Sequence, residues 1–218
     1  MQVACFFRIL HKSKNIMSEK KNIFSWLSDI SKIHHRAAFT DVAKLTTPRQ
    51  SSFLKLCKER YSCRSFKEER FMEDELASIL EAGRLAPTAC NKQPIHIWVV
   101  KTKDALTRLK EVTKYTFNAP AVLIVSYKPE EAWVRSCDGK NGGEVDAAIV
   151  ATHIMMEAAA IGLGTTWVGS FDPVKLAEQF PQTEGWVPVA LLPVGYPAAG
   201  PSANHDKRKE WTEIVSDL

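Results

Sequence analysis

Residues 144–161 are the feature of this sequence that most constrains its fold. The segment, Glu-Val-Asp-Ala-Ala-Ile-Val-Ala-Thr-His-Ile-Met-Met-Glu-Ala-Ala-Ala-Ile, is apolar on nearly every face of a helix. A soluble protein tolerates such a helix only at its centre or at a subunit interface. Gly162 and Gly164 follow directly and predict the end of the helix. The other elements of the chain are therefore expected to pack around this helix.

The segments on either side alternate between strand and helix patterns. Short apolar runs rich in β-branched residues predict strands at 95–100, 121–126, 165–168 and 187–194. Apolar side chains predict helices at 51–60, 73–86 (from Leu76, Ile79, Leu80 and Leu85) and 102–112. Asp172 followed by Pro173 predicts the start of a further helix. Thr102 and Asp172 are the expected caps of the last two helices. The sequence thus predicts a mixed α and β class.

The first 50 residues form a separate region in this interpretation. Apolar residues at helical spacing predict an amphipathic helix at 19–33, and residues 34–49 are typical of a linker. We therefore divide the chain into an N-terminal extension, 1–50, and a domain, 51–218. Met17 lies within the extension and is an alternative start.

Charge is distributed unevenly along the chain. Residues 1–70 carry 15 Lys/Arg and 6 Asp/Glu, whereas residues 71–218 carry 14 and 19, so the net charge of +4 conceals a basic first third. A basic region can bind nucleic acid or an anionic membrane, but so diffuse an excess is more typical of a solvated surface with a small anion site. No apolar run approaches the roughly 18 residues that span a bilayer. We expect neither a nucleic-acid nor a membrane partner.

Cysteine usage points to a reducing compartment. The five cysteines are odd in number and contain no C-x-x-C pair, which predicts neither a disulfide framework nor a structural zinc site. The cytoplasm is the expected location. The sequence also contains no P-loop, Rossmann fingerprint, H-E-x-x-H pair or G-x-S-x-G elbow, which argues against the enzyme classes that depend on them.

Two arginines and a serine alternate within residues 60–66, Arg-Tyr-Ser-Cys-Arg-Ser-Phe. In an extended chain Arg60, Ser62 and Arg64 project to one side. Two guanidiniums and a hydroxyl suit a phosphate dianion, because arginine binds phosphate oxygens in pairs. A solvated basic turn is the alternative. Cys63 lies between the arginines, and we hypothesise that its pKa is lowered and that it is redox-sensitive.

Three further segments are candidates for ligand contact. The polar loop 87–94 carries Asn91 and Gln93, whose donors and acceptors suit a flat heterocycle. Gly169 would allow a ligand to approach the backbone closely. The basic group at 205–209 could close over a phosphate. The alternatives are an ordinary turn, helix-stop chemistry and a solvated tail.

Together and in this order, these segments resemble the nitroreductase family of flavin enzymes. The resemblance extends from about Phe53 to Val215. It rests on Arg60-x-Ser-x-Arg-x-Phe66, Ala-Pro-Thr-x-x-Asn-x-Gln-Pro94, Leu163-Gly-Thr-Thr-Trp-Val-Gly169, and Leu192-Pro-Val-Gly-Tyr-Pro197 followed by Arg208-Lys209. It implies an α+β sandwich whose mixed, mainly antiparallel sheet is flanked by helices, in an intertwined homodimer that binds FMN at its interface.

The resemblance also implies roles for individual residues. Arg60, Ser62 and Arg64 would hold the FMN phosphate, with other basic residues near the C-terminus closing on it. Asn91 of the partner subunit would meet the isoalloxazine ring, and Gly169 would offer its backbone N–H near flavin N5. The full set of expected cofactor-binding residues is Arg60, Tyr61, Ser62, Arg64, Pro87, Thr88, Asn91, Gln93, Val168, Gly169, Lys207 and Arg208. No catalytic side chain and no metal ligand are expected, because flavin N5 carries the chemistry.

The function implied is an FMN-dependent oxidoreductase. It would pass hydride from NAD(P)H through flavin N5 to a nitroaromatic, quinone or flavin by a ping-pong mechanism. A flavin storage or sensor protein without significant turnover is the alternative, because it would share every binding motif. A nucleic-acid-binding module built on the basic first 70 residues is a third hypothesis.

Overall fold

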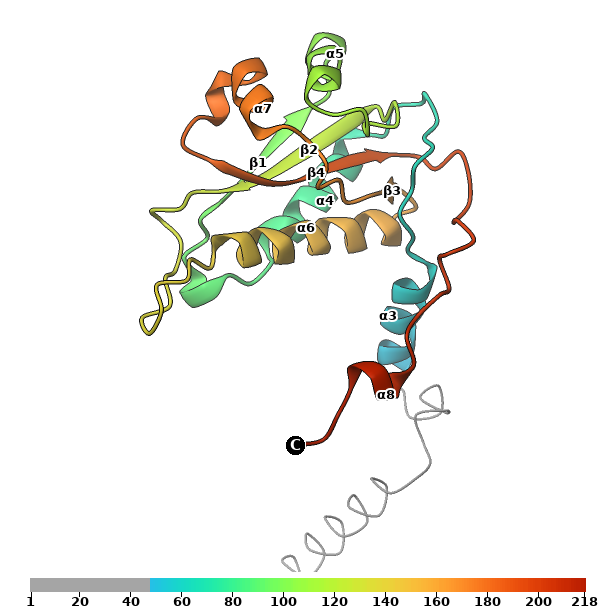
Figure 1. Cartoon of the computed structure of the whole chain (residues 1–218). Helices are drawn as coiled ribbons and strands as arrows, with labels where there is room; N and C mark the ends of the chain where they lie inside the picture. The colour runs from blue at the N-terminus through green and yellow to red at the C-terminus, as the bar shows by residue number, and fades with distance from the viewer. Residues whose placement is uncertain (1–47) are drawn as a thin grey trace, which may run out of the picture. The chain divides into compact units, whose positions relative to one another are not determined.

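The computed structural model describes residues 48–218, of which 52–208 form one compact unit (Figure 1). The helix predicted at 19–33 and Met17 lie outside the described residues. Residues 48–49, predicted as the end of a linker, are instead the first residues of helix α3 (Pro48–Glu59). Proline suits the first helical position, where its missing N–H would have no intrahelical partner. Residues 209–218, which include the short helix α8 (Trp211–Ile214), do not belong to this unit.

The sheet of this unit is antiparallel, with strand order β1-β2-β4-β3. One isolated parallel bridge, between Ser62 and Thr165, adds a parallel pair at its β3 edge. The strands are β1 (Ile95–Val100), β2 (Ala121–Tyr127), β3 (Gly164–Thr165) and β4 (Val187–Gly195). The helices that accompany them are α4 (Glu73–Arg84), α5 (Lys103–Val112), α6 (Gly143–Ala160) and α7 (Pro173–Gln179), with 3-10 turns at Ala89–Asn91 and Pro181–Thr183. The α+β class with a mainly antiparallel sheet is confirmed.

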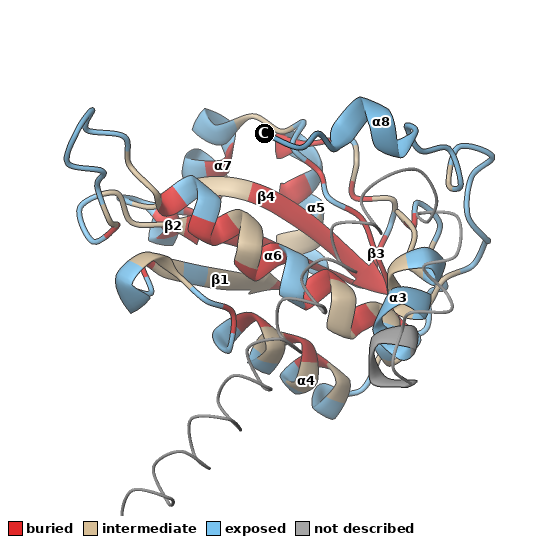
Figure 2. Ribbon diagram, turned by 90° about the horizontal axis from the view of Figure 1, so that it is seen from below, coloured by how far each residue is buried: buried red, intermediate tan, exposed pale blue. Residues whose placement is uncertain are grey.

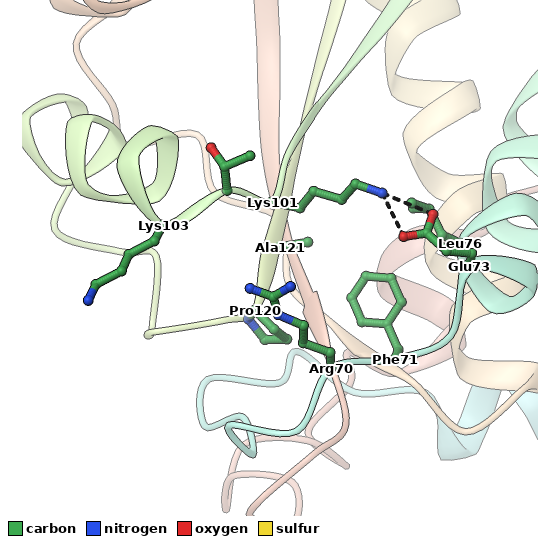
Figure 3. Close-up of a pocket in the computed structure, with 9 residues that line it drawn as sticks. Arg70, Phe71, Glu73, Leu76, Lys101, Lys103, Pro120 and Ala121 are labelled. Carbon is green, nitrogen blue, oxygen red and sulfur yellow. Dashed lines mark hydrogen bonds and ion pairs between the residues drawn. The ribbon is translucent and has the colours of Figure 1, made fainter.

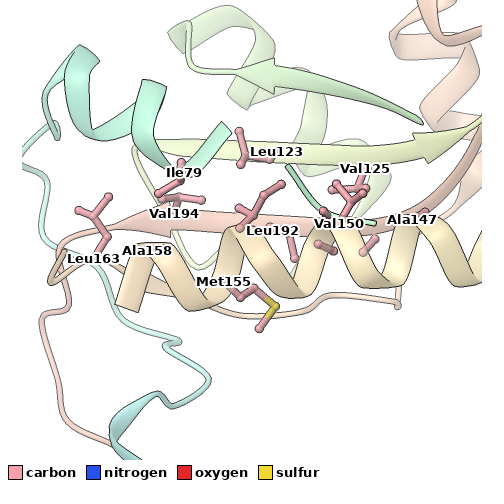
Figure 4. Close-up of a cluster of buried hydrophobic side chains, with 14 of the residues drawn as sticks. Ile79, Leu123, Val125, Ala147, Val150, Met155, Ala158, Leu163, Leu192 and Val194 are labelled. Atoms are coloured by element: carbon pink, nitrogen blue, oxygen red, sulfur yellow. The ribbon is translucent and has the colours of Figure 1, made fainter. Parts of the chain in front are cut away.

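Helices cover both faces of the sheet (Figure 1). Alternation along β2 directs Leu123 and Val125 toward α4 and α6, and Val122 and Ile124 toward α5 and α7. Figure 4 shows the first cluster, where Leu192 of β4 packs between the sheet and α6. Because both faces are covered, β2 is a continuous buried apolar run rather than an alternating one.

Helix α6 is central, one of the two placements that its composition predicted, but the other described elements leave one of its sides uncovered (Figure 2). Ala147, Val150 and Ile154 are buried against the sheet. On another side, Val145 is 52% exposed, and His153 is also exposed. A helix without a polar face therefore still presents apolar surface outside the fold of this chain.

Most predicted boundaries agree with the structure, and the differences have local causes. Thr102 caps α5 by accepting one hydrogen bond from a backbone N–H of the first turn, and Asp172 caps α7 by accepting two. The strand predicted at 165–168 is shorter, because only Gly164 and Thr165 pair continuously with β4. Leu85 was wrongly counted among the residues of its helix. It lies after the last helical residue, turned outward and 65% exposed.

Candidate functional site

Four of the residues predicted to bind a phosphate line one cavity of about 220 Å³. They are Arg60, Ser62, Arg64 and Arg208. Tyr61 lines the same cavity, and its hydroxyl donates a hydrogen bond to the backbone oxygen of Ala199 at 2.7 Å. The structure thus brings together residues that are almost 150 positions apart in the sequence.

The strand-like segment after α3 positions this group because it lies against β3. The backbone N–H of Cys63 donates to the oxygen of Thr165 at 2.9 Å, and Ser62 forms a parallel bridge with the same residue. Cys63 is buried against Gly164, where an added Cβ would lie 2.8 Å from the Cys63 sulfur. Because the Cys63 side chain faces inward, those of its two neighbours, Ser62 and Arg64, remain accessible on the cavity side.

The cavity is strongly cationic. Among the described residues three arginines line it, and no acidic residue does. Within the described residues, the Arg60 guanidinium has no hydrogen-bond or ion-pair partner, and that of Arg64 makes one long contact, 3.3 Å, to the backbone oxygen of Ser62. Arg208 donates to the backbone oxygens of His205 and Lys207. Guanidinium donors remain available for an anion such as a phosphate.

Sequence reasoning missed two of the lining residues, Ser202 and Asn204, and included His205 only as part of the basic group 205–209. Ser202, Asn204 and His205 line the cavity, and His205 is held by a 2.7 Å contact between its Nε2 and the backbone oxygen of Lys58. The polar run that contains them was the available signal. Lys207 is not among the lining residues, since the turn at 204–207 carries it past the cavity.

The hypothesis that Cys63 has a lowered pKa is wrong. Cys63 is 1% exposed, and burial raises the pKa of its thiol above the usual value. Hydrogen bonds with the Ser65 backbone and the Tyr61 hydroxyl offset this effect only in part. The nearby guanidiniums project into the cavity, while the sulfur faces the protein interior, where the neutral thiol is favoured.

This burial predicts selective thiol chemistry. At mildly alkaline pH, iodoacetamide should modify the exposed Cys90 and Cys137 at least roughly tenfold faster than Cys63, because the raised pKa lowers the thiolate fraction and burial blocks access. Peptide mass spectrometry after timed alkylation measures each site, and denaturant provides the control in which Cys63 should react fully. Equal rates in the folded protein would contradict the buried placement of Cys63.

The loop that carries Asn91 and Gln93 is a tight turn tied to the start of α6. Thr88 accepts hydrogen bonds from the backbone N–H of Asn91 at its carbonyl oxygen, 2.9 Å, and from that of Gln93 at its hydroxyl, 3.0 Å. The backbone N–H of Ala89 donates to Asp146 at 2.9 Å. Asn91 and Gln93 are exposed, as is Pro87. The side-chain amides of Asn91 and Gln93 are therefore accessible to a ligand or to another chain.

Gly169 and Val168 occupy different environments. Val168 is buried, and both its backbone N–H and its carbonyl bond to Leu191, at 2.9 and 3.0 Å. It can therefore position Gly169 but has no free backbone group for a ligand. Gly169 is exposed, and its N–H has no partner among the described residues. Trp167, which sequence reasoning passed over, is 38% exposed, and its indole Nε1 would lie 3.6 Å from a Cβ at Gly169.

A second cavity, of about 300 Å³, contains none of the predicted site residues (Figure 3). Arg70 and Phe71 face it, and Lys101 crosses it to pair with Glu73 at 2.7 Å. The positive charge of Lys101 is thus already neutralised by Glu73. The arginine cavity combines more unpaired cationic groups with fewer apolar walls, which suits a phosphate better.

The described residues contain neither a membrane-spanning helix nor a metal-binding cluster. In the range 48–218, no helix has the length and apolar character needed to cross a bilayer. Over the same range, no cluster of three or more His, Cys, Asp or Glu side chains is arranged to hold a metal ion.

Comparisons with known proteins agree on one family. A family model described as "Nitroreductase family" matches residues 57–118 and 113–196. A protein of Methanothermobacter thermautotrophicus, provisionally named NADH dehydrogenase/NAD(P)H nitroreductase, is 29% identical over 160 residues, covering 68% of this chain and 78% of that protein.

Solved structures show the same likeness. A nitroreductase family protein from Clostridium difficile 630 is 32% identical, with a TM-score of 0.71 over 75% of this chain and 96% of its own. A protein of Exiguobacterium sibiricum 255-15, provisionally described as a nitroreductase in complex with FMN, has a TM-score of 0.68 and 20% identity, covering 76% of this chain and 97% of its own. The latter likeness concerns the fold alone.

Proposed function

The chain belongs to the nitroreductase family, and we propose that it is an FMN-dependent NAD(P)H oxidoreductase. The observation that carries this proposal is the cavity lined by Arg60, Ser62, Arg64 and Arg208. A cavity with three guanidiniums and no acidic lining residue fits the phosphate of FMN. The FMN complex of the Exiguobacterium sibiricum protein, which has the same fold, supports the choice of cofactor.

The chain also offers contacts for the rest of the cofactor. From Thr165, which bridges to Ser62, the backbone continues to the exposed Gly169. A flavin held by its phosphate beside Ser62 would extend along this segment and accept a hydrogen bond from the free N–H of Gly169. The absence of a side chain at this position keeps the backbone approachable. In this arrangement Trp167 would line the same surface.

We further propose a homodimer, because a single chain separates the two parts of the site. The loop with Asn91 is tied to the first turn of α6, whereas β3 and the arginine cavity follow the last turn (Figure 1). The 18 residues of α6 place these ends about 27 Å apart. One FMN cannot bridge that length, so Asn91 of a partner subunit would complete the site. The open side of α6 around Val145 and Ile149 provides an apolar surface for this partner.

When bound, FMN supplies two-electron chemistry between NAD(P)H and an acceptor such as a nitroaromatic, quinone or free flavin, with donor and acceptor binding in turn in a ping-pong sequence. The residues of this chain bind and orient the cofactor. The arginines neutralise its phosphate, Gly169 donates to the ring edge, and the Asn91 and Gln93 amides meet the ring's polar edge. No described side chain is required as a general acid or base. We place the enzyme in the cytoplasm, consistent with its free cysteines.

The visible absorption spectrum of the purified protein tests this proposal. A flavin spectrum with one FMN per chain, bleached by NAD(P)H under anaerobic conditions and restored by a quinone, is the expected result. Bound FMN that NAD(P)H fails to reduce would favour the storage or sensor alternative. A protein that stays colourless after incubation with FMN and gel filtration would refute the proposal.

A further inference from the structure

Asp146 is a buried carboxylate that is only half satisfied. It lies in the first turn of α6 and is 2% exposed. One oxygen, Oδ1, accepts the 2.9 Å hydrogen bond from the Ala89 N–H, and the other, Oδ2, is buried without a partner among the described residues. Burying a carboxylate in this way costs folding free energy, because its lost hydration is not fully replaced by hydrogen bonds. Such a group in a native structure calls for an explanation.

The turn that Asp146 holds is strained. Cys90, Asn91 and Gln93 have φ values of 51°, 52° and 52°, in the left-handed region that residues other than glycine seldom adopt. Such a conformation persists only where surrounding contacts impose it. The hydrogen bonds from Asn91 and Gln93 to Thr88 lie within the turn itself. They shape the turn but do not place it relative to the rest of the fold.

Placement of the turn depends on contacts with other elements. Among the described hydrogen bonds, two connect residues 88–93 to other elements: the bond from Ala89 to Asp146, and a longer one from the Lys92 ammonium to the backbone oxygen of Ala132, 3.4 Å. The next residue, Pro94, accepts a bond from the Lys128 N–H at 2.9 Å, where β1 begins. Asp146 is the firmer anchor, because it is buried and its helix is fixed. The Gly143 backbone is packed against the ring of Tyr127, and the partial positive charge of the helix N-terminus favours a carboxylate there.

We propose that Asp146 is a positioning residue for the flavin ring, acting through the turn at 88–93. Its Oδ1 fixes the Ala89 N–H and so sets where the Asn91 and Gln93 amides are presented. This inference rests on the proposed function, since it is FMN that these amides would meet. The cost of burying a half-satisfied carboxylate is explained if the carboxylate aligns a binding loop rather than stabilises the fold.

Hydrogen exchange in the FMN-free protein tests the anchor without the cofactor. Asp146→Leu and Asp146→Ala remove the acceptor and should raise the exchange rate of the Ala89 amide at least about tenfold. Asp146→Asn keeps an acceptor oxygen and should leave that rate within about threefold of wild type. The exposed Glu178→Ala is the control for loss of a helical carboxylate. Unchanged exchange of Ala89 in both acceptor-free variants would overturn the inference.

FMN titration tests the consequence. The acceptor-free variants should bind FMN about tenfold more weakly and shift the visible spectrum of the bound flavin, whereas Asp146→Asn should retain both. The thermal unfolding midpoints of the acceptor-free variants should not fall along with their FMN affinity. Replacing a half-satisfied buried charge with an apolar group is commonly neutral or stabilising. Wild-type affinity in the acceptor-free variants, or equal weakening in Asp146→Asn, would overturn the inference. Wild-type protein that binds no FMN would instead refute the proposed function, and the exchange measurement would still decide whether Asp146 holds the turn.

Discussion

Replacing both Arg60 and Arg64 with alanine should weaken FMN binding roughly 100-fold or more. The two side chains line the same cavity, and the Arg60 guanidinium has no competing partner among the described residues. A hydrogen bond to a charged group contributes about 1.5–3 kcal/mol, and two such losses at the phosphate combine to at least this factor. Equilibrium dialysis or quenching of FMN fluorescence measures the change.

The control for loss of positive charge on this segment is Lys67→Ala, which removes one charge where the double variant removes two. Lys67 carries the same charge, lies on the same segment and is exposed, but it does not line the cavity. Its loss should change FMN affinity less than about twofold, since an exposed charge outside contact distance is screened by salt. Equal weakening in the control would mean that general positive charge, and not the arginine cavity, attracts the cofactor. Unchanged affinity in the double variant would show that the arginine cavity does not bind FMN.

Gly143→Ala should destabilise the fold by about 3 kcal/mol, the upper part of the range for overpacking. An added Cβ would lie 2.0, 2.5 and 2.7 Å from three ring atoms of Tyr127, including the Cγ at the root of the ring. The backbone of α6 or the end of β2 would have to move. Alanine is otherwise the better helix former by about 1 kcal/mol, so a loss of stability identifies the steric contact as its cause.

Chemical denaturation of the FMN-free protein measures this loss. Gly200→Ala is the control, since nothing lies within 4 Å of its added Cβ and its φ is not in the left-handed region. Its free energy of unfolding should match wild type within about 0.5 kcal/mol. A Gly143→Ala variant as stable as wild type would show that the Tyr127 ring can rotate away. The contact would then not be what fixes the start of α6.

The sequence indicated the local structure well where local chemistry decides it. The bounds of β1 and the caps at Thr102 and Asp172 follow from β-branched runs and from side chains that accept backbone N–H bonds. Leu85 was counted as a helical residue together with Leu76, Ile79 and Leu80, although the helix had already ended at Arg84. Periodicity marks a face of a helix but does not mark its last turn.

Within the candidate site, alternation predicted that Arg60, Ser62 and Arg64 share one side, and all three line the arginine cavity. The pKa of Cys63 was inferred in the wrong direction, because sequence neighbours suggested a cationic environment while burial sets the actual one. Ser202 and Asn204 reach the cavity from a distant segment, and the polar run that contains them does not by itself indicate this position, whereas His205 belongs to the basic group at 205–209 that was expected to close over a phosphate.

The sequence by itself determined where most of the helices and strands lie, and that α6 must be buried at the centre of the fold or at a subunit interface, because both follow from the spacing and polarity of neighbouring side chains. Tertiary structure alone decided that Asp146 is buried beneath the turn at 88–93, and that this turn and the arginine cavity lie at opposite ends of α6. Burial and proximity between distant segments depend on how the whole chain packs. No local pattern along the sequence contains that information.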